Sequence, residues 1–187
     1  MNISAPFNDF TPADAVDFHG RIINDMRECG DEIARRVGDR SVVDYGCGPG
    51  VDAGRYTPGQ YTGIDVSQPL LDEARRRNPS HQFDCNRGRP ATWIHAGRVA
   101  HVMFKAVLEH QADADAVLWV LADAMRMASK SVLVAWHTPP RKTEAIREVV
   151  GASGRRIYQS TFALADFEHV RRTVTLIGAH ELWEITP

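Results

Sequence analysis

The sequence predicts an α/β fold, a doubly wound and mostly parallel seven-stranded sheet with helices on both faces. Three observations indicate it. Short β-branched runs alternate with segments whose apolar residues recur at helical spacing. A glycine-rich turn follows the first of these runs. Two apolar runs near the end of the chain flank Gly178 and Ala179, which predicts a closing hairpin and an antiparallel C-terminal strand.

Seven strands are expected, each a short apolar run bounded by glycine, proline or polar residues. They cover residues 41–46, 61–66, 81–85, 99–107, 131–136, 174–178 and 180–185. Because helical or loop segments separate the first five strands, these five should run parallel to one another.

Helices are expected where apolar residues recur at helical spacing behind a capping residue. Thr11 and Pro12 begin the first helix, which should end near Gly30. Ser67 caps a later helix that stops before Pro79. The remaining helical segments are residues 31–37, a short one at 51–56, 113–128, 143–150 and 163–172.

Length and composition are those of one globular domain. The 187 residues are 43% hydrophobic and 25% charged, and no linker or internal repeat divides them. We therefore expect a single domain over residues 1–187. Within it, residues 1–38 would form an N-terminal helical flank or lid, and residues 41–187 the α/β core.

Several classes of partner and location are disfavoured. No apolar run approaches the roughly 20 residues of a membrane span, and the N-terminus lacks the layout of a secretory signal. The three cysteines are far apart and form no CxxC pair, so neither a disulfide framework nor a metal site is predicted. A cytoplasmic location is expected. The formal net charge of −2 argues against a broad nucleic-acid surface.

The stretch DYGCGPG follows the first expected strand. Gly46, Gly48 and Gly50 can adopt backbone angles closed to other residues, and they let a ligand approach the main chain. Ligands of a doubly wound sheet bind beyond the carboxyl ends of its strands. Asp65 ends the next expected strand, where a carboxylate can accept both hydroxyls of a ribose. The turn and Asp65 together indicate a site for a nucleoside cofactor.

Two cofactor classes fit this turn. From Gly48 the chain satisfies GxGxxA through Ala53, so an NAD-type dinucleotide stays possible. Asp44 and Pro49 oppose it, because a carboxylate repels a pyrophosphate and proline lacks the N–H that would bind one. A cofactor with a cationic amino group and a sulfonium, such as S-adenosylmethionine, would instead be attracted to Asp44.

The motif VVDYGCGPG resembles the first motif of class I S-adenosylmethionine-dependent methyltransferases. YTGIDVSQPLLDEAR is similar to their second strand and following helix, and FDCN to the end of their third strand. HVMFKAVLEHQAD and SVLVAW are similar to their fourth-strand motif and fifth strand. The resemblance spans residues 41–136 and implies a Rossmann-like fold and S-adenosylmethionine as methyl donor, with S-adenosylhomocysteine as its product.

The sequence departs from this family at two places. The helix after Gly50 is short, since Pro58 and Gly59 end it. Ala100 and His101 stand where the family often has an acid at the start of its fourth strand.

The resemblance also implies contacts with the cofactor. Asp44 and the backbone of residues 46–50 would face its methionine part, and Asp65 its ribose. Asp84 would accept the adenine amino group, with the N–H of Cys85 beside it. The implied cofactor-binding residues are Asp44, Gly46, Cys47, Gly48, Gly50, Asp65, Val66, Asp84, Cys85, Lys105 and Ala106.

The fourth-strand motif would border the reacting atoms, with the main chain of Lys105 and Ala106 next to the sulfonium. Methyl transfer is an in-line displacement, so the protein chiefly aligns donor and acceptor. An oxygen or nitrogen acceptor also loses a proton, which suits a histidine that titrates near neutrality. His110 and His137 are the catalytic candidates, because each follows the carboxyl end of a core strand.

The predicted function is S-adenosylmethionine-dependent methyl transfer to an oxygen or nitrogen of a small-molecule acceptor. Three alternatives remain open at this point: a methyltransferase of RNA or DNA, a non-catalytic S-adenosylmethionine-binding protein, and an NAD enzyme.

Overall fold

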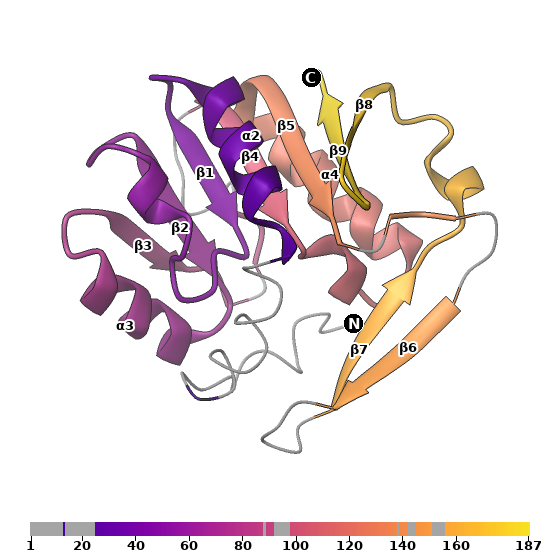
Figure 1. Ribbon diagram of the computed structural model, residues 1–187, viewed down its shortest axis with the longest axis horizontal. Coiled ribbons are helices and arrows are strands. Elements are labelled where there is room, and N and C mark those ends of the chain that lie inside the picture. The colour runs from indigo at the N-terminus through magenta and orange to yellow at the C-terminus, as the bar shows by residue number, and fades with distance from the viewer. Residues whose placement is uncertain are drawn as a thin grey trace.

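A computed structural model gives the architecture of the chain (Figure 1). It describes residues 13, 25–87, 89–91, 98–137, 139–141, 145–150 and 156–187, with the backbone alone at 145–150 and 156–159. Seven strands form one sheet in the order β3-β2-β1-β4-β5-β9-β8, and β6 and β7 form a separate two-stranded sheet.

The strands of the large sheet are β1 Val42–Tyr45, β2 Tyr61–Asp65, β3 Gln82–Cys85, β4 Val99–Lys105, β5 Ala128–Trp136, β8 Arg172–Ile177 and β9 His180–Ile185. The small sheet contains β6 Ala145–Val150 and β7 Arg156–Thr161. The α-helices are α2 Arg27–Val37, α3 Gln68–Arg77 and α4 Ala114–Met127. Short 3₁₀ turns are η1 Ala53–Arg55, η3 Leu108–His110 and η4 Leu164–Phe167.

The large sheet confirms the predicted fold class. Strands β1 to β5 pair in parallel, whereas β9 pairs antiparallel with both β5 and β8. The closing hairpin therefore adds its second strand, β9, next to β5 and its first strand, β8, at the edge. The strand order reverses between β1 and β4. Such a reversal opens a crevice at the carboxyl ends of the strands, where ligands of this architecture bind.

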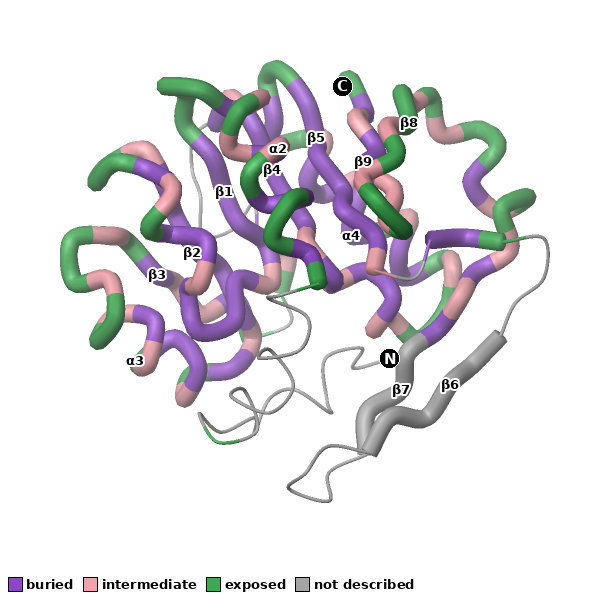
Figure 2. The backbone as a smooth tube through the Cα atoms, viewed as in Figure 1, coloured by how far each residue is buried: buried purple, intermediate pink, exposed green. Residues whose placement is uncertain are grey.

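Each face of the sheet has its own hydrophobic core, as alternation along buried strands requires. On one face, α2 and α3 pack through Ile33 and Leu71 against strand residues that include Val42. On the other face, α4 packs against residues that include Val43 and Trp136. The predicted placement of helices on both faces is confirmed. Figure 2 shows the buried strands lying between the helices of these two layers.

The predicted Ser67 cap is present, and the structure shows a second side-chain cap at the start of α4. The Ser67 side chain accepts a hydrogen bond from the N–H of Leu70 at the start of α3, at 3.4 Å. The Asp113 carboxylate accepts one from the N–H of Ala116 at the start of α4, at 2.8 Å. In both helices a side-chain oxygen thus satisfies one of the N–H groups that a first turn leaves unpaired.

The expected helix boundary at Gly30 is wrong, because α2 runs through Gly30 from Arg27 to Val37. A Cβ atom at Gly30 would lie 2.9 Å from Asp52 Oδ1 and 3.0 Å from Arg55 Nε. Glycine is therefore present for close packing and not as a helix stop. The earlier part of the predicted N-terminal helix, with the exception of Ala13, lies outside the described residues.

The expected helix at residues 143–150 is also wrong. Residues 145–150 form strand β6, which pairs antiparallel with β7. The apolar positions Ile146, Val149 and Val150 satisfy helical spacing, but their β-branched side chains favour an extended backbone. The strand that pairs with them was not predicted, and a pairing partner is what decides between the two conformations.

Smaller differences concern element ends. β5 begins at Ala128, directly after α4, and not at residue 131. Of the helix expected at 163–172, the structure has the short turn η4. Within the described part of the chain, no helix is long and apolar enough to cross a membrane.

Candidate functional site

Predicted site residues from four strands end at the same edge of the sheet. Asp44 lies in β1 next to the turn, Asp65 ends β2, Asp84 and Cys85 end β3, and Lys105 ends β4. Because these strands are parallel neighbours, their carboxyl ends lie side by side where the strand order reverses between β1 and β4.

The glycine turn after β1 is held closely against its neighbours. Gly46, Gly48 and Gly50 have φ of 81°, 53° and 70°, values that favour glycine. The N–H of Gly46 donates to the carbonyl of Ile64 at 2.7 Å. A Cβ atom at Gly46 would lie 2.7 Å from the Val107 side chain. Position 46 thus requires glycine both for its backbone angle and for its contact with the loop after β4.

Asp65 connects this turn to the end of β2. Its carboxylate accepts hydrogen bonds from the N–H of Gly48 at 2.8 Å and from the N–H of Ser67 at 2.9 Å. Burial raises the pKa of Asp65, while these backbone donors act in the opposite direction. Two carboxylate oxygens offer about four acceptor positions, so the group can still accept from a ligand's hydroxyls.

Asp44 is a nearly inaccessible carboxyl group with a specific partner. The Tyr61 hydroxyl donates a hydrogen bond to its Oδ2 at 2.7 Å. Burial, with the charge of Asp52 adding to it, raises the pKa of Asp44 to about 7. The hydrogen bond from Tyr61 and the charge of Lys105 oppose this shift. An added positive charge in the crevice would therefore favour the ionised form of Asp44.

A buried ion pair closes the side of this cluster nearest α2. Lys105 pairs with Asp52, and their side chains are 7% and 4% exposed. Asp52 also pairs with Arg55 at 2.9 Å, and Arg55 pairs with Asp31 of α2. Such close approach is possible because α2 has Gly30 at the contact. A chain of charges thus fixes α2 to the loop that follows the glycine turn.

The carboxyl end of β3 offers further acceptors. The Asp84 carboxylate, which is half-buried, accepts from Gln82 Nε2 at 2.9 Å. The Cys85 thiol is 3.5 Å from the carbonyl of Val66. Asn86 is buried, and its N–H donates to the carbonyl of Asp65 at 3.1 Å. Its Oδ1 accepts no hydrogen bond from the described residues, which leaves one acceptor available beside the ends of β2 and β3.

Ala106 has an unusual backbone at the end of β4. Its φ is 54° although it is not glycine, and its N–H donates to the carbonyl of Ala135 at 3.0 Å. Backbone strain of this kind persists where the surroundings enforce it, often at ligand sites. Cys47 in the glycine turn is buried, and burial raises the pKa of its thiol well above the ordinary value. It is thus suited to packing and not to nucleophilic attack.

The two predicted catalytic histidines lie on two segments, η3 and the residues after β5, which a hydrogen bond to Glu109 connects. His110 ends η3, and His137 follows β5. The Glu109 Oε1 accepts a hydrogen bond from the N–H of His137 at 3.0 Å. The His137 ring lies 5.5 Å from that of His180, centroid to centroid, and His180 Nε2 is 3.0 Å from the carbonyl oxygen of Asp25.

The sequence reasoning missed several of these residues. Tyr61, Asp52 and Arg55 belong to the cluster only through contacts across elements, which no local pattern indicates. Asn86 could have been found, since it follows the predicted adenine-binding acid by two positions. Among the described residues, no cluster of His, Cys, Asp and Glu could hold a metal ion.

Part of the chain matches a known protein family. Residues 42–131 match the family model of the methyltransferase domain. This match supports the resemblance to class I S-adenosylmethionine-dependent methyltransferases that the motifs predicted. A search of curated protein sequences gave no match.

Solved structures share the fold. The chain is similar to DesVI of Streptomyces venezuelae, with a TM-score of 0.62, 14% identity, and coverage of 89% of this chain and 92% of that one. It is similar to CalS10, an amino pentose methyltransferase from Micromonospora echinaspora, with a TM-score of 0.61, 14% identity and coverage of 91% and 94%. It is also similar to the 1,6-didemethyltoxoflavin-N1-methyltransferase of Burkholderia thailandensis, with a TM-score of 0.59, 17% identity, and coverage of 92% of this chain and 85% of that one. At these identities the likeness shows the fold alone.

Proposed function

We propose that this chain, whose residues 42–131 match the family model of the methyltransferase domain, is a class I S-adenosylmethionine-dependent methyltransferase that transfers a methyl group to an oxygen or nitrogen of a small-molecule acceptor. One observation carries the proposal. Buried carboxyl groups, Asp44, Asp52 and Asp65, surround the glycine turn at the carboxyl edge of the sheet.

The charge of this cluster favours a cationic cofactor. The two cations of the cluster, Lys105 and Arg55, both pair with Asp52. Asp44 and Asp65 are buried carboxyl groups with no ion-pair partner among the described residues. S-adenosylmethionine supplies an activated methyl group on a sulfonium, and it carries a cationic amino group as well. A pyrophosphate, by contrast, would enter a region that already holds negative charge. The electrostatics therefore support S-adenosylmethionine over a dinucleotide.

The residues fit the parts of this cofactor in order. Asp44 and the glycine turn suit its methionine part, and Asp65 its ribose hydroxyls. Asp84 and the free Oδ1 of Asn86 suit the adenine amino group, because both are acceptors at the end of β3. The carboxylate on Asp65 is already oriented by Gly48 and Ser67, so little reordering is needed to receive a ribose.

The acceptor would bind where η3 and the end of β5 meet. Here Glu109 holds the backbone of His137, and β7 packs against η3. His110 and His137 are the groups we expect to contact the acceptor. One of their ring nitrogens would take the proton that an acceptor hydroxyl or amine loses as its oxygen or nitrogen bonds to the methyl carbon.

A small acceptor is supported by the structural neighbours and by the hairpin. CalS10 is an amino pentose methyltransferase, and the toxoflavin enzyme was crystallised with its small substrate. In this chain the β6–β7 hairpin stands beyond the carboxyl edge of the sheet (Figure 1). It would border the acceptor on the side opposite the cofactor.

The test is transfer of isotope-labelled methyl from S-adenosylmethionine into a cell extract that contains small metabolites, RNA and DNA. Label in the small-molecule fraction, lost with His110→Ala and His137→Ala combined, supports the proposal. Label confined to nucleic acid contradicts the small acceptor. Binding of the cofactor without labelling of any fraction favours a non-catalytic binding protein.

A further inference from the structure

Strand β8 is the exposed edge of the seven-stranded sheet. Its pairing partner among the described strands is β9, on one side. Val174 and Leu176 of β8 are 45% and 74% exposed. Figure 2 shows that β8 is exposed or half-buried along its length, in contrast to the inner strands. Such an edge leaves backbone donors and acceptors available to another strand.

Two hollows flank β8, one at each end. The first has a volume of about 760 Å³ and is lined by residues that include Val170, Arg171, Arg172 and Thr173. The second has a volume of about 610 Å³ and lies between α2 and the end of β8. Its lining includes Glu28, Asp31, Glu32, Arg35 and Leu176. Each end of the edge strand β8 therefore lies beside a surface hollow.

The two ends expose side chains of opposite charge. Arg171 and Arg172 stand at the start of β8, where Glu184 of the same lining is paired with Arg36. At the other end Asp31 and Glu32 of α2 are in ion pairs with arginines, and Glu28 is the further acid of that lining. Arg171 and Glu28 are both exposed. Neither has an ion-pair partner within the described part of the chain.

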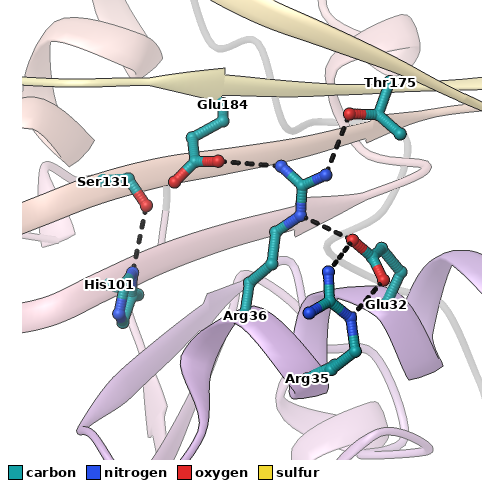
Figure 3. A network of polar contacts seen from close by, with 7 residues as sticks. All are labelled: Glu32, Arg35, Arg36, His101, Ser131, Thr175 and Glu184. Atoms are coloured by element: carbon teal, nitrogen blue, oxygen red, sulfur yellow. Dashed lines mark hydrogen bonds and ion pairs between the residues drawn. The ribbon is translucent and has the colours of Figure 1, made fainter.

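Helix α2 holds its carboxylates in a defined place beside β8. Arg36 of α2 pairs with Glu184 of β9 at 2.8 Å and donates to Thr175 Oγ1 of β8 at 2.9 Å. Arg36 also pairs with Glu32 at 2.8 Å. Figure 3 shows how these contacts tie the helix to the last two strands. The acidic end of the β8 edge is thus part of the folded structure.

We propose that β8 pairs antiparallel with β8 of a second copy of this chain, about a two-fold axis near the middle of the strand. The sheet would then continue across the dimer. This rotation brings the start of one β8 opposite the end of the other. Arg171 of each copy would face Glu28 of its partner, and the exposed Val174 and Leu176 would be covered.

A second copy fits this edge better than an unrelated strand. The basic and acidic ends lie on the same molecule, at opposite ends of one strand, so the surface is complementary to itself. Self-complementarity under a two-fold rotation is what an isologous dimer requires. Val174 and Leu176 are two positions apart and lie on the same face of the sheet, so the dimer would cover both together.

Sedimentation equilibrium of the full chain over a wide concentration range tests the proposal. We expect a monomer–dimer equilibrium. Val174→Lys and Leu176→Lys should each raise the dimer dissociation constant at least tenfold, because like charges would meet near the axis. Trp119→Lys is the matched control, since Trp119 is 42% exposed on α4 and away from β8. It should leave the constant unchanged.

A charge exchange tests the orientation of the pairing. Arg171→Glu and Glu28→Arg should each weaken self-association, whereas an equimolar mixture of the two variants should form a heterodimer with both ion pairs restored. Circular dichroism checks that each variant is folded. A wild-type chain that stays monomeric, or a dimer unaffected by the β8 variants, overturns the proposal. A mixture that gains no association overturns this antiparallel register. None of these outcomes depends on cofactor binding.

Discussion

Removal of the Asp65 carboxylate should weaken both the cofactor site and the fold. In Asp65→Ala the N–H groups of Gly48 and Ser67 lose the acceptor that lies 2.8 and 2.9 Å from them. The end of β2 then has no group that could accept the ribose hydroxyls. The substitution thus affects the glycine turn and the proposed ligand contact together.

The magnitudes follow from these contacts. A buried donor left without an acceptor costs about 1–3 kcal/mol. Since burial raises the pKa of Asp65, the ionised carboxylate also carries a desolvation penalty that its removal relieves. For the two donors together the cost would be about 2–6 kcal/mol. Because the relieved desolvation penalty offsets part of it, we expect the unfolding free energy to fall by about 2–4 kcal/mol. Lost hydrogen bonds to a charged group should weaken S-adenosylmethionine binding by about 1.5–3 kcal/mol, or roughly ten- to 150-fold.

Two measurements separate these effects. Urea unfolding gives the change in stability, and calorimetric titration of the folded variant gives the change in affinity. Asp72→Ala is the control, because Asp72 is an exposed carboxylate on α3 that pairs with Arg75 at 2.9 Å. That control should change neither quantity appreciably. A folded Asp65→Ala protein with wild-type stability and affinity would refute both the hydrogen-bond argument and the ribose assignment.

Three further predictions concern the same edge of the sheet. Burial raises the pKa of Asp44 to about 7. Between about pH 4 and 7 the Asp44 carboxyl group is therefore protonated in the folded protein and ionised in the unfolded chain. This group thus makes the free energy of unfolding fall as pH rises through that window. A cationic ligand should expel the proton, so calorimetry at pH 6 in buffers of different ionisation enthalpy should detect proton release that Asp44→Asn abolishes. Gly46→Ala should lower the free energy of unfolding by more than Gly59→Ala. Both glycines have positive φ, but a Cβ at Gly46 would lie 2.7 Å from the Val107 side chain, whereas nothing lies within 4 Å of one at Gly59. Equal losses in urea unfolding would remove the packing argument. His137→Asn should lower kcat for methyl transfer at least tenfold and leave the S-adenosylmethionine Kd unchanged, and an unaltered kcat would exclude His137 as the base.

Much of the fold could be predicted because its signals are local. The strands from β1 to β5 are short β-branched runs that end at glycine, proline or polar residues, and the Ser67 cap marks the start of α3. The β6 segment could not be predicted in the same way. Its apolar positions fit two periodicities, and its conformation is decided by pairing with β7, a partner that has no strong pattern of its own.

The site was predictable to the extent that strand ends meet in a parallel sheet. That rule brings Asp44 and Asp65 together, whereas Lys105 was expected there from the resemblance to the methyltransferase family. The buried pair between Asp52 and Lys105 and the hydrogen bond from Tyr61 to Asp44 do not. The ion pair depends on how closely the loop after the glycine turn approaches α2, where Gly30 lies against Asp52 and Arg55. The hydrogen bond depends on the pairing of β1 with β2.

The buried carboxyl groups around the glycine turn should bind a cationic nucleoside cofactor. Calorimetric titration of the purified chain with S-adenosylmethionine, S-adenosylhomocysteine and NAD tests it most directly. We expect micromolar binding of the first two and no binding of NAD. Binding of NAD, or silence from the first two on protein shown to be folded, would contradict it.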